Sequence, residues 1–292
     1  MKRLFVLIIF LSIGSQLFSQ VPKDINLYLF KKRYNKKTWD IISKKKGILS
    51  IDILSGFMID PKKDGSIFYE SVSNYLSKIY PQIEDKGLLC INLENQLFQN
   101  LKLLKKDDPR IKHSLVTFVS LIKYVKKLRP NVKIGIYGLP IRTFHVQEND
   151  NSDRKLDAIL SNCDYIMPSL YIIYPDKQIT LKRNYDYLKQ NLDQAFSYGA
   201  RLKKPVLPFV WYLVHPINKK YGYEMLSPTE MKRYITFIKQ YKYKNLNTVG
   251  GIIWWETPTP YRENKIRTSN DMQPLVKLDC NDVLMNYMNH IL

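Results

Sequence analysis

The stretch Gly87-Leu88-Leu89-Cys90-Ile91-Asn92-Leu93-Glu94 decides how the rest of the sequence is interpreted. Alternate side chains of a strand point to opposite faces, and both faces of this stretch are apolar until one of them ends in Asn92 and Glu94. Apolar residues on both faces are typical of a parallel strand that is covered on both sides. In α/β barrels, catalytic side chains lie at the C-terminal ends of such strands. The stretch therefore predicts a buried strand that presents Asn92 and Glu94 at a barrel mouth, although a single glutamate there more often caps a loop.

The first 20 residues have the three-part pattern of a secretory signal peptide. Lys2 and Arg3 form a basic start, an apolar run covers residues 4–13, and a more polar segment covers residues 14–20, which is the order found in signal peptides. The apolar run is too short to cross a bilayer as a helix. We therefore expect residues 1–20 to be removed and the mature chain to be exported, to the periplasm or the medium, with no integral membrane segment.

The mature chain, residues 21–292, has the length of one barrel domain. The whole sequence carries 46 Lys and Arg against 26 Asp and Glu, a formal net charge of +20. This excess favours an anionic partner such as an acidic polysaccharide, or it reflects lysines that are spread over the outer faces of helices. No nucleic-acid-binding motif accompanies the lysines, so we expect no nucleic-acid partner.

Neither a metal centre nor a cofactor is expected. The three cysteines, Cys90, Cys163 and Cys280, do not have the spacing of a disulfide framework or of a metal site. Cys90 and Cys163 lie in or beside apolar, strand-like stretches, so they are most simply small core residues. A disulfide between two of the three stays open.

Short apolar runs alternate with longer amphipathic runs along the mature chain. The predicted strands are Ile25–Phe30, Gly47–Ile53, Gly87–Glu94, Val132–Gly138, Tyr165–Tyr171, Pro205–Trp211 and Gly250–Trp255. The predicted helices are Ile67–Tyr80, Ile111–Leu128, Ser152–Leu160, Leu181–Tyr198 and Pro228–Tyr243. This alternation predicts parallel βα units and, since no linker separates them, a single-domain α/β fold: a (β/α) TIM-like barrel of seven or eight parallel strands. An open doubly wound sheet is the alternative, but no glycine-rich phosphate loop follows the first strand.

The C-terminal ends of later strands carry aromatic side chains and a second acid. These candidates for substrate binding are Tyr171, Phe209, Trp211, Tyr212, Trp254 and Glu256. Strand alternation places Trp254 and Glu256 on the same face. Aromatic rings bury the flat C–H faces of sugars and leave the sugar hydroxyls free to form hydrogen bonds. Rings that gather beside a carboxylate at a barrel mouth indicate a glycosidase.

Five segments, in order along nearly the whole mature chain, resemble motifs of the hyaluronidases (glycoside hydrolase family 56). The segments are Cys90–Glu94, which resembles a strand ending in Asp-Trp-Glu; Ile134–Pro140, which resembles Trp-Gly-Phe-Tyr-Gly-Phe-Pro; Pro168–Tyr171, which resembles Pro-Ser-Ile-Tyr; Pro205–Val210, which resembles Pro-Val-Leu-Pro-Tyr-Val; and Gly250–Trp254, which resembles Gly-Val-Val-Leu-Trp. The resemblance implies a barrel that hydrolyses a polysaccharide containing β-linked N-acetylhexosamine, such as an anionic glycosaminoglycan.

The resemblance also implies roles for single residues. In this family the acetamido oxygen of the substrate attacks the anomeric carbon, which is an exception to the scheme of two protein carboxylates. By position, Glu94 resembles the general acid, which later acts as the base for water. Tyr171 would form a hydrogen bond with the acetamido group, and Trp254 would wall the subsite of the N-acetyl methyl group.

Two positions depart from the family pattern. Asn92 stands where the family has the Asp that stabilises the positive charge on the acetamide, and Phe209 stands where the family has a tyrosine. Loss of such an electrostatic contribution costs on the order of 10²–10³ in rate. Two alternatives therefore stand beside the hyaluronidase-like reading: a glycosidase that uses Glu94 and Glu256 as its two carboxylates, and a carbohydrate-binding barrel without catalysis.

Overall fold

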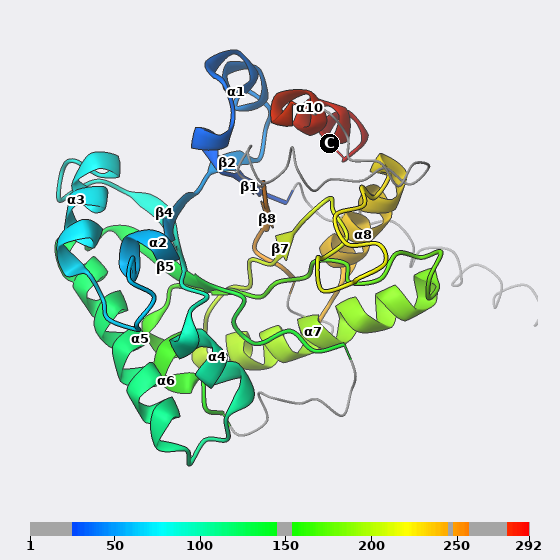
Figure 1. Ribbon diagram of the computed structural model, residues 1–292. Coiled ribbons are helices and arrows are strands. Elements are labelled where there is room, and N and C mark those ends of the chain that lie inside the picture. Colours follow the sequence, from blue (N-terminus) through cyan, green and yellow to red (C-terminus); the bar gives the residue numbers. More distant parts are fainter. Residues whose placement is uncertain (1–24, 145–153, 245–247, 257–278, 292) are drawn as a thin grey trace, which may run out of the picture.

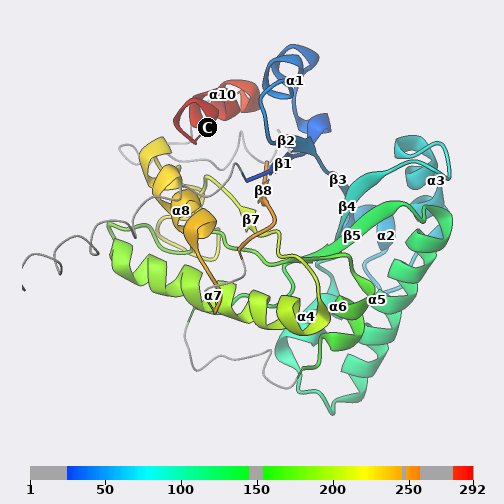
Figure 2. The ribbon, with the colours of Figure 1, turned by 180° about the vertical axis from the view of Figure 1, so that it is seen from behind.

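The computed structural model describes residues 25–144, 154–244, 248–256 and 279–291. The predicted signal peptide over residues 1–20 lies outside these ranges. Within them, no helix is both long enough and apolar enough to cross a membrane. Neighbouring strands are parallel and the helices lie around them, which is the architecture of a TIM-like barrel (Figures 1 and 2).

Strands and helices alternate along most of the chain. The strands are β1 (Leu27–Leu29), β2 (Ile48–Ser50), β3 (Asp52–Ser55), β4 (Gly87–Asn92), β5 (Val132–Tyr137), β6 (Tyr165–Met167), β7 (Phe209–Val210) and β8 (Ile252–Trp254). The helices are the 3-10 helix η1 (Lys31–Arg33) and the α-helices α1 (Lys36–Ile42), α2 (Gly56–Ile59), α3 (Tyr69–Ile79), α4 (Gln96–Leu103), α5 (Pro109–Leu128), α6 (Asp157–Asn162), α7 (Leu181–Leu202), α8 (Pro228–Gln240) and α10 (Cys280–Ile291).

Hydrogen bonds join the strands into a ring. The strands pair in two sets, in the orders β2-β1-β8-β7 and β3-β4-β5-β6. Only Ile51 separates β2 from β3, so these two strands form one extended segment that joins the sets. The other junction lies between the β6 and β7 segments. There, Ile166 N–H donates to Pro205 O at 3.0 Å and Leu170 N–H donates to Phe209 O at 2.9 Å. The predicted parallel barrel is therefore confirmed.

The two ends of the described chain meet in this ring. Strand β1 pairs with β8, with Leu27 opposite Ile252 and Leu29 opposite Trp254. Helix α10 packs against α8, and α1 lies near α10 in both views (Figures 1 and 2). The first and last strands thus close the barrel together.

Strands β6 and β7 are shorter than the sequence predicts, because proline interrupts the hydrogen-bond ladder. Pro168 and Pro208 have no N–H group to donate to a neighbouring strand. Between the β6 and β7 segments the ladder is reduced to two isolated parallel bridges, Ile166 with Val206 and Ser169 with Phe209. The chain remains extended here, so the strand ends still reach the mouth of the barrel.

Helices α3, α5, α6, α7 and α8 correspond to the five predicted ones, with shifted bounds, and α7 and α8 begin at the predicted residues. Helix α6 begins at Asp157 rather than at the predicted Ser152, which lies outside the described residues. The sequence analysis missed α1, α2, α4, α10 and the 3-10 helix η1. Helix α1 has a capping signal, since the Asn35 side chain accepts the N–H of Thr38 in the way of an N-cap residue, but its apolar pattern is too short to be distinctive.

The buried core supports the prediction for β4. Residues 88–91 of this strand are all buried, and the strand lies between β3 and β5. One continuous cluster of buried apolar side chains extends from the strands to the surrounding helices. A strand covered on both faces is held firmly, so β4 is a rigid support for the polar residues at its end.

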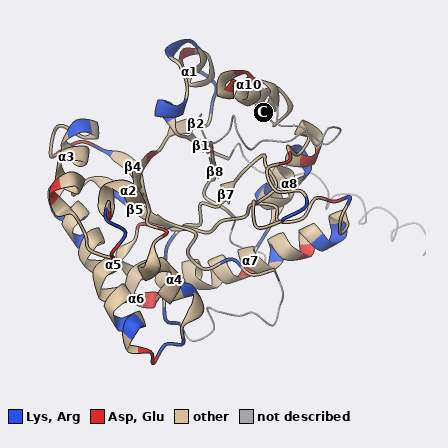
Figure 3. Cartoon of the chain, in the orientation of Figure 1, with Lys and Arg blue, Asp and Glu red and all other residues tan. Residues whose placement is uncertain are grey.

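Basic residues are distributed widely over the described helices. Figure 3 shows Lys and Arg on α1, α3, α5 and α7, with acidic residues among them. Several of these lysines form ion pairs within one helix, including Lys36 with Asp40 and Lys189 with Asp193. The arrangement favours lysines spread over helix exteriors as the source of much of the positive charge.

The three cysteines are free and buried. Cys90 and Cys163 have no exposed surface, and burial raises the pKa of the Cys163 thiol to about 12. Both are therefore unreactive core residues, as the sequence predicts. The disulfide that the sequence left open is not formed in this structure.

Candidate active site

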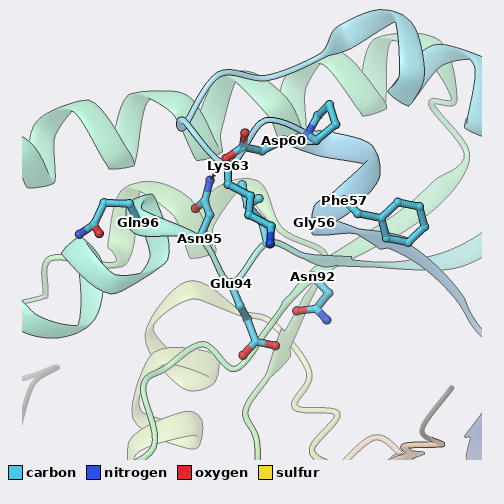
Figure 4. A pocket seen from close by; sticks show the side chains of 10 residues that line it. Gly56, Phe57, Asp60, Lys63, Asn92, Glu94, Asn95 and Gln96 are labelled. Carbon is cyan, nitrogen blue, oxygen red and sulfur yellow. Dashed lines mark hydrogen bonds between the residues drawn. The ribbon is translucent and has the colours of Figure 1, made fainter. Parts of the chain in front are cut away.

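The end of β4 carries the first two candidate residues. The strand ends at Asn92, which is half-buried, and Glu94 follows on the connection to α4 and is exposed. Asn95 ends this connection, since its Oδ1 accepts the N–H groups of Leu97 and Phe98 and caps α4. Figure 4 shows the Asn92 and Glu94 side chains pointing to the same side, away from Asn95. A carboxyl and an amide therefore lie together at the mouth of the barrel, as predicted from the strand pattern.

A pocket of about 480 Å³ lies beside Glu94. One wall comes from the end of β4 and the residues that follow it, and the other comes from α2 and the next loop, with Phe57, Asp60 and Lys63 (Figure 4). Small-molecule sites have volumes of about 300–1,000 Å³. The pocket is therefore large enough for part of a sugar chain.

The protein around Glu94 changes its acidity. The Glu94 side chain is exposed at the mouth, but the protein packed around its carboxyl displaces part of the surrounding water and raises the carboxyl's pKa above its ordinary value; the positive charge of Arg142 and a hydrogen bond from Asn92 limit the rise. Burial disfavours the charged form of a carboxyl, and a nearby cation or a donor to the carboxylate favours it. Glu94 thus keeps its proton to a higher pH than an ordinary glutamate, which suits a general acid.

Two tyrosines face Glu94 from the neighbouring strands. Tyr137 ends β5 and Tyr171 follows β6, and their ring centroids are 6.0 Å apart. Burial and then the charge of Glu94 raise the pKa of Tyr137 to about 12. Burial and the neighbouring Tyr137, with a further contribution from Glu94, raise the pKa of Tyr171. Both hydroxyls therefore stay protonated and can act as hydrogen-bond donors.

Arg142 is a site residue that the sequence analysis missed. It follows the Gly-Leu-Pro turn after β5, donates from Nη1 to Ser169 Oγ at 2.8 Å and donates from Nη2 to His215 Nε2 at 3.0 Å. Its guanidinium carbon lies 5.8 Å from the ring centroid of Tyr171. Burial and the charges of Arg142 and Lys102 lower the pKa of His215 to about 3. His215 is therefore neutral, and its Nε2 accepts the hydrogen bond that positions Arg142.

Aromatic rings continue this wall across the mouth. Trp211 lies 5.4 Å from Tyr171, and Phe209 lies edge-on to Tyr137 at 5.0 Å, both measured between ring centroids. Phe209 has no exposed surface and Trp211 is 5% exposed. Both rings are therefore buried, Phe209 against Tyr137 and Trp211 against Tyr171, and they support the wall from behind.

Two solved structures of bee venom hyaluronidase are similar to this chain. The monoclinic crystal form matches it with a TM-score of 0.61 and 16% sequence identity, over 83% of this chain and 93% of the bee protein. The complex with a hyaluronic acid tetramer matches with a TM-score of 0.58 and 18% identity, over 79% and 90% of the two chains. The fold is hyaluronidase-like. In the sequence comparisons, no protein-family model and no curated protein matches the chain.

Three of the predicted site residues of this hyaluronidase-like barrel form a separate cluster. Tyr212 O–H donates to Glu256 Oε1 at 3.0 Å, and the Trp254 ring stacks on Tyr212 with centroids 5.7 Å apart. Tyr287 of α10 packs against both rings. Trp254, Tyr212 and Glu256 have no exposed surface. The structure therefore corrects the expectation that Trp254 and Glu256 share a cleft with Glu94, because they pack beneath the C-terminal helix.

The side chain that faces the mouth from the end of β8 is instead that of Trp255. Its ring lies 5.4 Å from Phe30 and 6.4 Å from Phe209, the residue that contacts Tyr137. The sequence contains a signal for this, since Gly251–Trp255 matches Gly-Val-Val-Leu-Trp as well as Gly250–Trp254 does. A shift of one residue reverses the face of every side chain, which explains why Trp254 was assigned to the wrong face.

Tyr212→Phe is expected to destabilise the fold without changing hydrolytic activity. The change removes the donor to the buried Glu256 carboxyl, and a buried acceptor that loses its donor costs about 1–3 kcal/mol. Thermal unfolding and activity assays would check this. Tyr185→Phe is the matched control, because the Tyr185 ring stacks on an aromatic neighbour, Phe237, as the Tyr212 ring stacks on Trp254. Loss of activity in a normally stable Tyr212→Phe variant would contradict the structural role.

Proposed function

We propose that this protein is an exported glycoside hydrolase that cleaves a polysaccharide containing β-linked N-acetylhexosamine, with Glu94 as the general acid and then the base. The carboxyl of Glu94, with its raised pKa at the end of β4 beside a pocket, is the observation that carries this proposal. The hyaluronidase-like fold supports the class of reaction. The bee enzyme was crystallised with a hyaluronic acid tetramer, which supports a polysaccharide as the substrate.

The surroundings of Glu94 favour assistance by the substrate's acetamido group over a second protein carboxylate. In the described part of the chain, the charged group that acts on Glu94 is Arg142, and Glu256 lies in the separate cluster with Tyr212. The ordinary schemes need two carboxyl groups on either side of the scissile bond. The acetamido oxygen therefore serves as the nucleophile, while Glu94 protonates the departing oxygen and then activates water.

The tyrosines and Asn92 position the acetamido group. Tyr171 and Tyr137 remain protonated donors next to Glu94, and a donor to the acetamido group holds its oxygen below the anomeric carbon. Asn92 Oδ1 is buried and has no partner among the described residues. This amide supplies no charge to stabilise the acetamide as it becomes positive, so we expect a slower enzyme than one with an aspartate at this position.

Activity is expected to fall as the pH rises through the raised pKa of Glu94. The protonated carboxyl is the form that donates a proton, and burial preserves that form to a higher pH than in an ordinary glutamate. The dependence of kcat/KM on pH reports this group in the free enzyme. Arg142→Gln should move the fall to a still higher pH, because it removes the charge that limits the rise. A fall that moves to lower pH in this variant would contradict the assignment.

A panel of polymers tests the proposal directly. Reducing ends would be measured with hyaluronan, chondroitin, their de-N-acetylated forms and a neutral β-glucan, and binding would be measured in parallel. We expect turnover of the N-acetylated polymers only. Turnover of de-N-acetylated polymers would favour the two-carboxylate scheme, and binding without turnover would identify a carbohydrate-binding barrel. Amino-terminal sequencing of the exported protein would test removal of residues 1–20.

A further inference from the structure

Glu94 lies between two different walls. In the strand order β3-β4-β5-β6, helix α2 follows β3 on one side of β4; on the other side, Tyr137 ends β5 and Tyr171 follows β6. The proposed function places the N-acetylhexosamine on the side of the tyrosines. A general acid protonates the oxygen between the retained sugar and the departing sugar, so it lies between their subsites. The departing sugar then belongs on the α2 side.

We propose that the pocket between α2 and the end of β4 binds the departing sugar, with Phe57 as a stacking platform and Lys63 as the cation for a negatively charged group on that sugar. The inference rests on the proposed function and extends it to the leaving-group side. Phe57, Lys63 and Glu94 all line the same pocket (Figure 4).

Phe57 is placed as a stacking platform. It is 70% exposed although it is fully apolar, and it lines the pocket that contains Glu94. An exposed aromatic ring gains about 1.5–3 kcal/mol when it is fully buried, and the C–H face of a sugar covers part of it. Phe68 in the same region is 50% exposed but does not line the pocket, so it provides a matched control.

Lys63 provides a positive charge that no carboxylate neutralises directly. It is exposed, and it takes part in none of the ion pairs formed by the described residues. Figure 4 shows its side chain extending across the pocket toward the end of β4. A cation at the rim of a site selects anionic ligands. It mainly affects the rate at which the ligand associates and the position in which the ligand binds.

The carboxylate of Asp60 fixes the two walls to each other. Its Oδ1 accepts a hydrogen bond from the Asp64 N–H at 3.1 Å. Its Oδ2 accepts one from the Gly65 N–H at 3.0 Å and one from Asn95 Nδ2 at 2.7 Å. Asp60 is only 3% exposed. The loop that carries Lys63 is therefore tied to the residue directly after Glu94, so the pocket exists before a ligand enters.

Kinetics with two kinds of substrate test this inference. Hyaluronan has a sugar as its leaving group, whereas 4-nitrophenyl N-acetyl-β-glucosaminide does not. For Phe57→Ala, KM for hyaluronan should rise about tenfold, which corresponds to about 1.4 kcal/mol of lost contact. The ratio of kcat/KM for hyaluronan to kcat/KM for the aryl glycoside should fall by a similar factor. Phe68→Ala should change neither.

The contribution of Lys63 is tested by salt and by removal of charge from the substrate. Lys63→Gln should raise KM for hyaluronan about threefold at low ionic strength, and the effect should vanish at about 1 M salt, where the Debye length is about 3 Å. It should also vanish with carboxyl-reduced hyaluronan, and Lys62→Gln is the control. The effect of Lys63→Gln should persist with unsulfated chondroitin, in which the uronic acid carboxylate is the charged group.

The outcomes separate this inference from the proposed function. A wild-type protein that hydrolyses none of the substrates overturns both. If the wild-type protein hydrolyses hyaluronan, but Phe57→Ala and Lys63→Gln behave like their controls, the leaving-group pocket is overturned and the glycosidase stands. Hydrolysis of the aryl glycoside alone would overturn both the leaving-group pocket and the polysaccharide substrate, and would leave only a glycosidase of small substrates. A larger loss with hyaluronan than with the aryl glycoside supports the assignment.

Discussion

Glu94→Gln is expected to lower the turnover of the polysaccharide by about 10²-fold or more while it leaves affinity and stability nearly unchanged. The amide keeps the shape of the carboxyl but has no acidic proton to give to the departing oxygen. Glu94 is exposed and lies outside the hydrophobic core, so an isosteric change there costs little stability. Reducing-end assays, binding of hyaluronan oligosaccharides and thermal unfolding would measure the three quantities.

Glu84→Gln is the matched control for this variant, because Glu84 is also exposed and does not line the pocket. It should behave as the wild-type protein in all three measurements. Wild-type turnover in Glu94→Gln would remove Glu94 from the mechanism. If the wild type and the variant both bind hyaluronan oligosaccharides but neither hydrolyses the polysaccharide, the protein is the non-catalytic carbohydrate-binding barrel.

Asn92→Asp is expected to raise turnover, by up to about 10²-fold, and to move the alkaline fall of the pH profile to a higher pH. The new carboxylate would stabilise the positive acetamide, a contribution on the order of 10²–10³ in rate. It would also replace the amide that donates to Glu94 with a like charge, which raises the pKa of one member of the pair. The pH dependence of kcat and kcat/KM would show both effects, with apparent pKa values that belong to the pair.

Asn92→Ala tests whether the added charge or merely the loss of the amide causes the effect of Asn92→Asp, because it removes the amide without adding a carboxylate. It should lose activity, whereas Asn92→Asp gains it. If Asn92→Asp has unchanged or lower activity, and Glu256→Gln is inactive but folded, the two-carboxylate scheme replaces assistance by the substrate. An inactive Glu256→Gln variant that is also unfolded would instead agree with the structural role of Glu256 beneath α10.

The barrel and the end of β4 could be predicted from the sequence because their signals are local. A strand that is apolar on both faces has a recognisable pattern, and the two polar residues at its end follow directly from strand alternation. Tyr171 and Trp211 could be placed near this end of the barrel for the same reason, since both lie at the ends of predicted strands; their roles stay predictions. In each case the prediction needed only neighbouring residues.

The rest of the site depends on contacts between distant segments. Arg142 lies on a loop, and its partners Ser169 and His215 come from other βα units, so no local pattern marks it. The faces of Trp254 and Trp255 depend on the register of β8 against β1 and β7. Two adjacent tryptophans fit either register by composition, and only the packing of α10 over Trp254 decides between them.

The pairing of β1 with β8 determines the order in which this chain can fold. Strand β1 lies far before β8 in the chain, so one of its two edges has no partner until Ile252 to Trp254 have been added. Pairing over such a long sequence separation is slow, and an unpaired strand edge is a template for aggregation. The barrel therefore cannot close until β8 has been synthesised, and one edge of β1 stays unpaired until then.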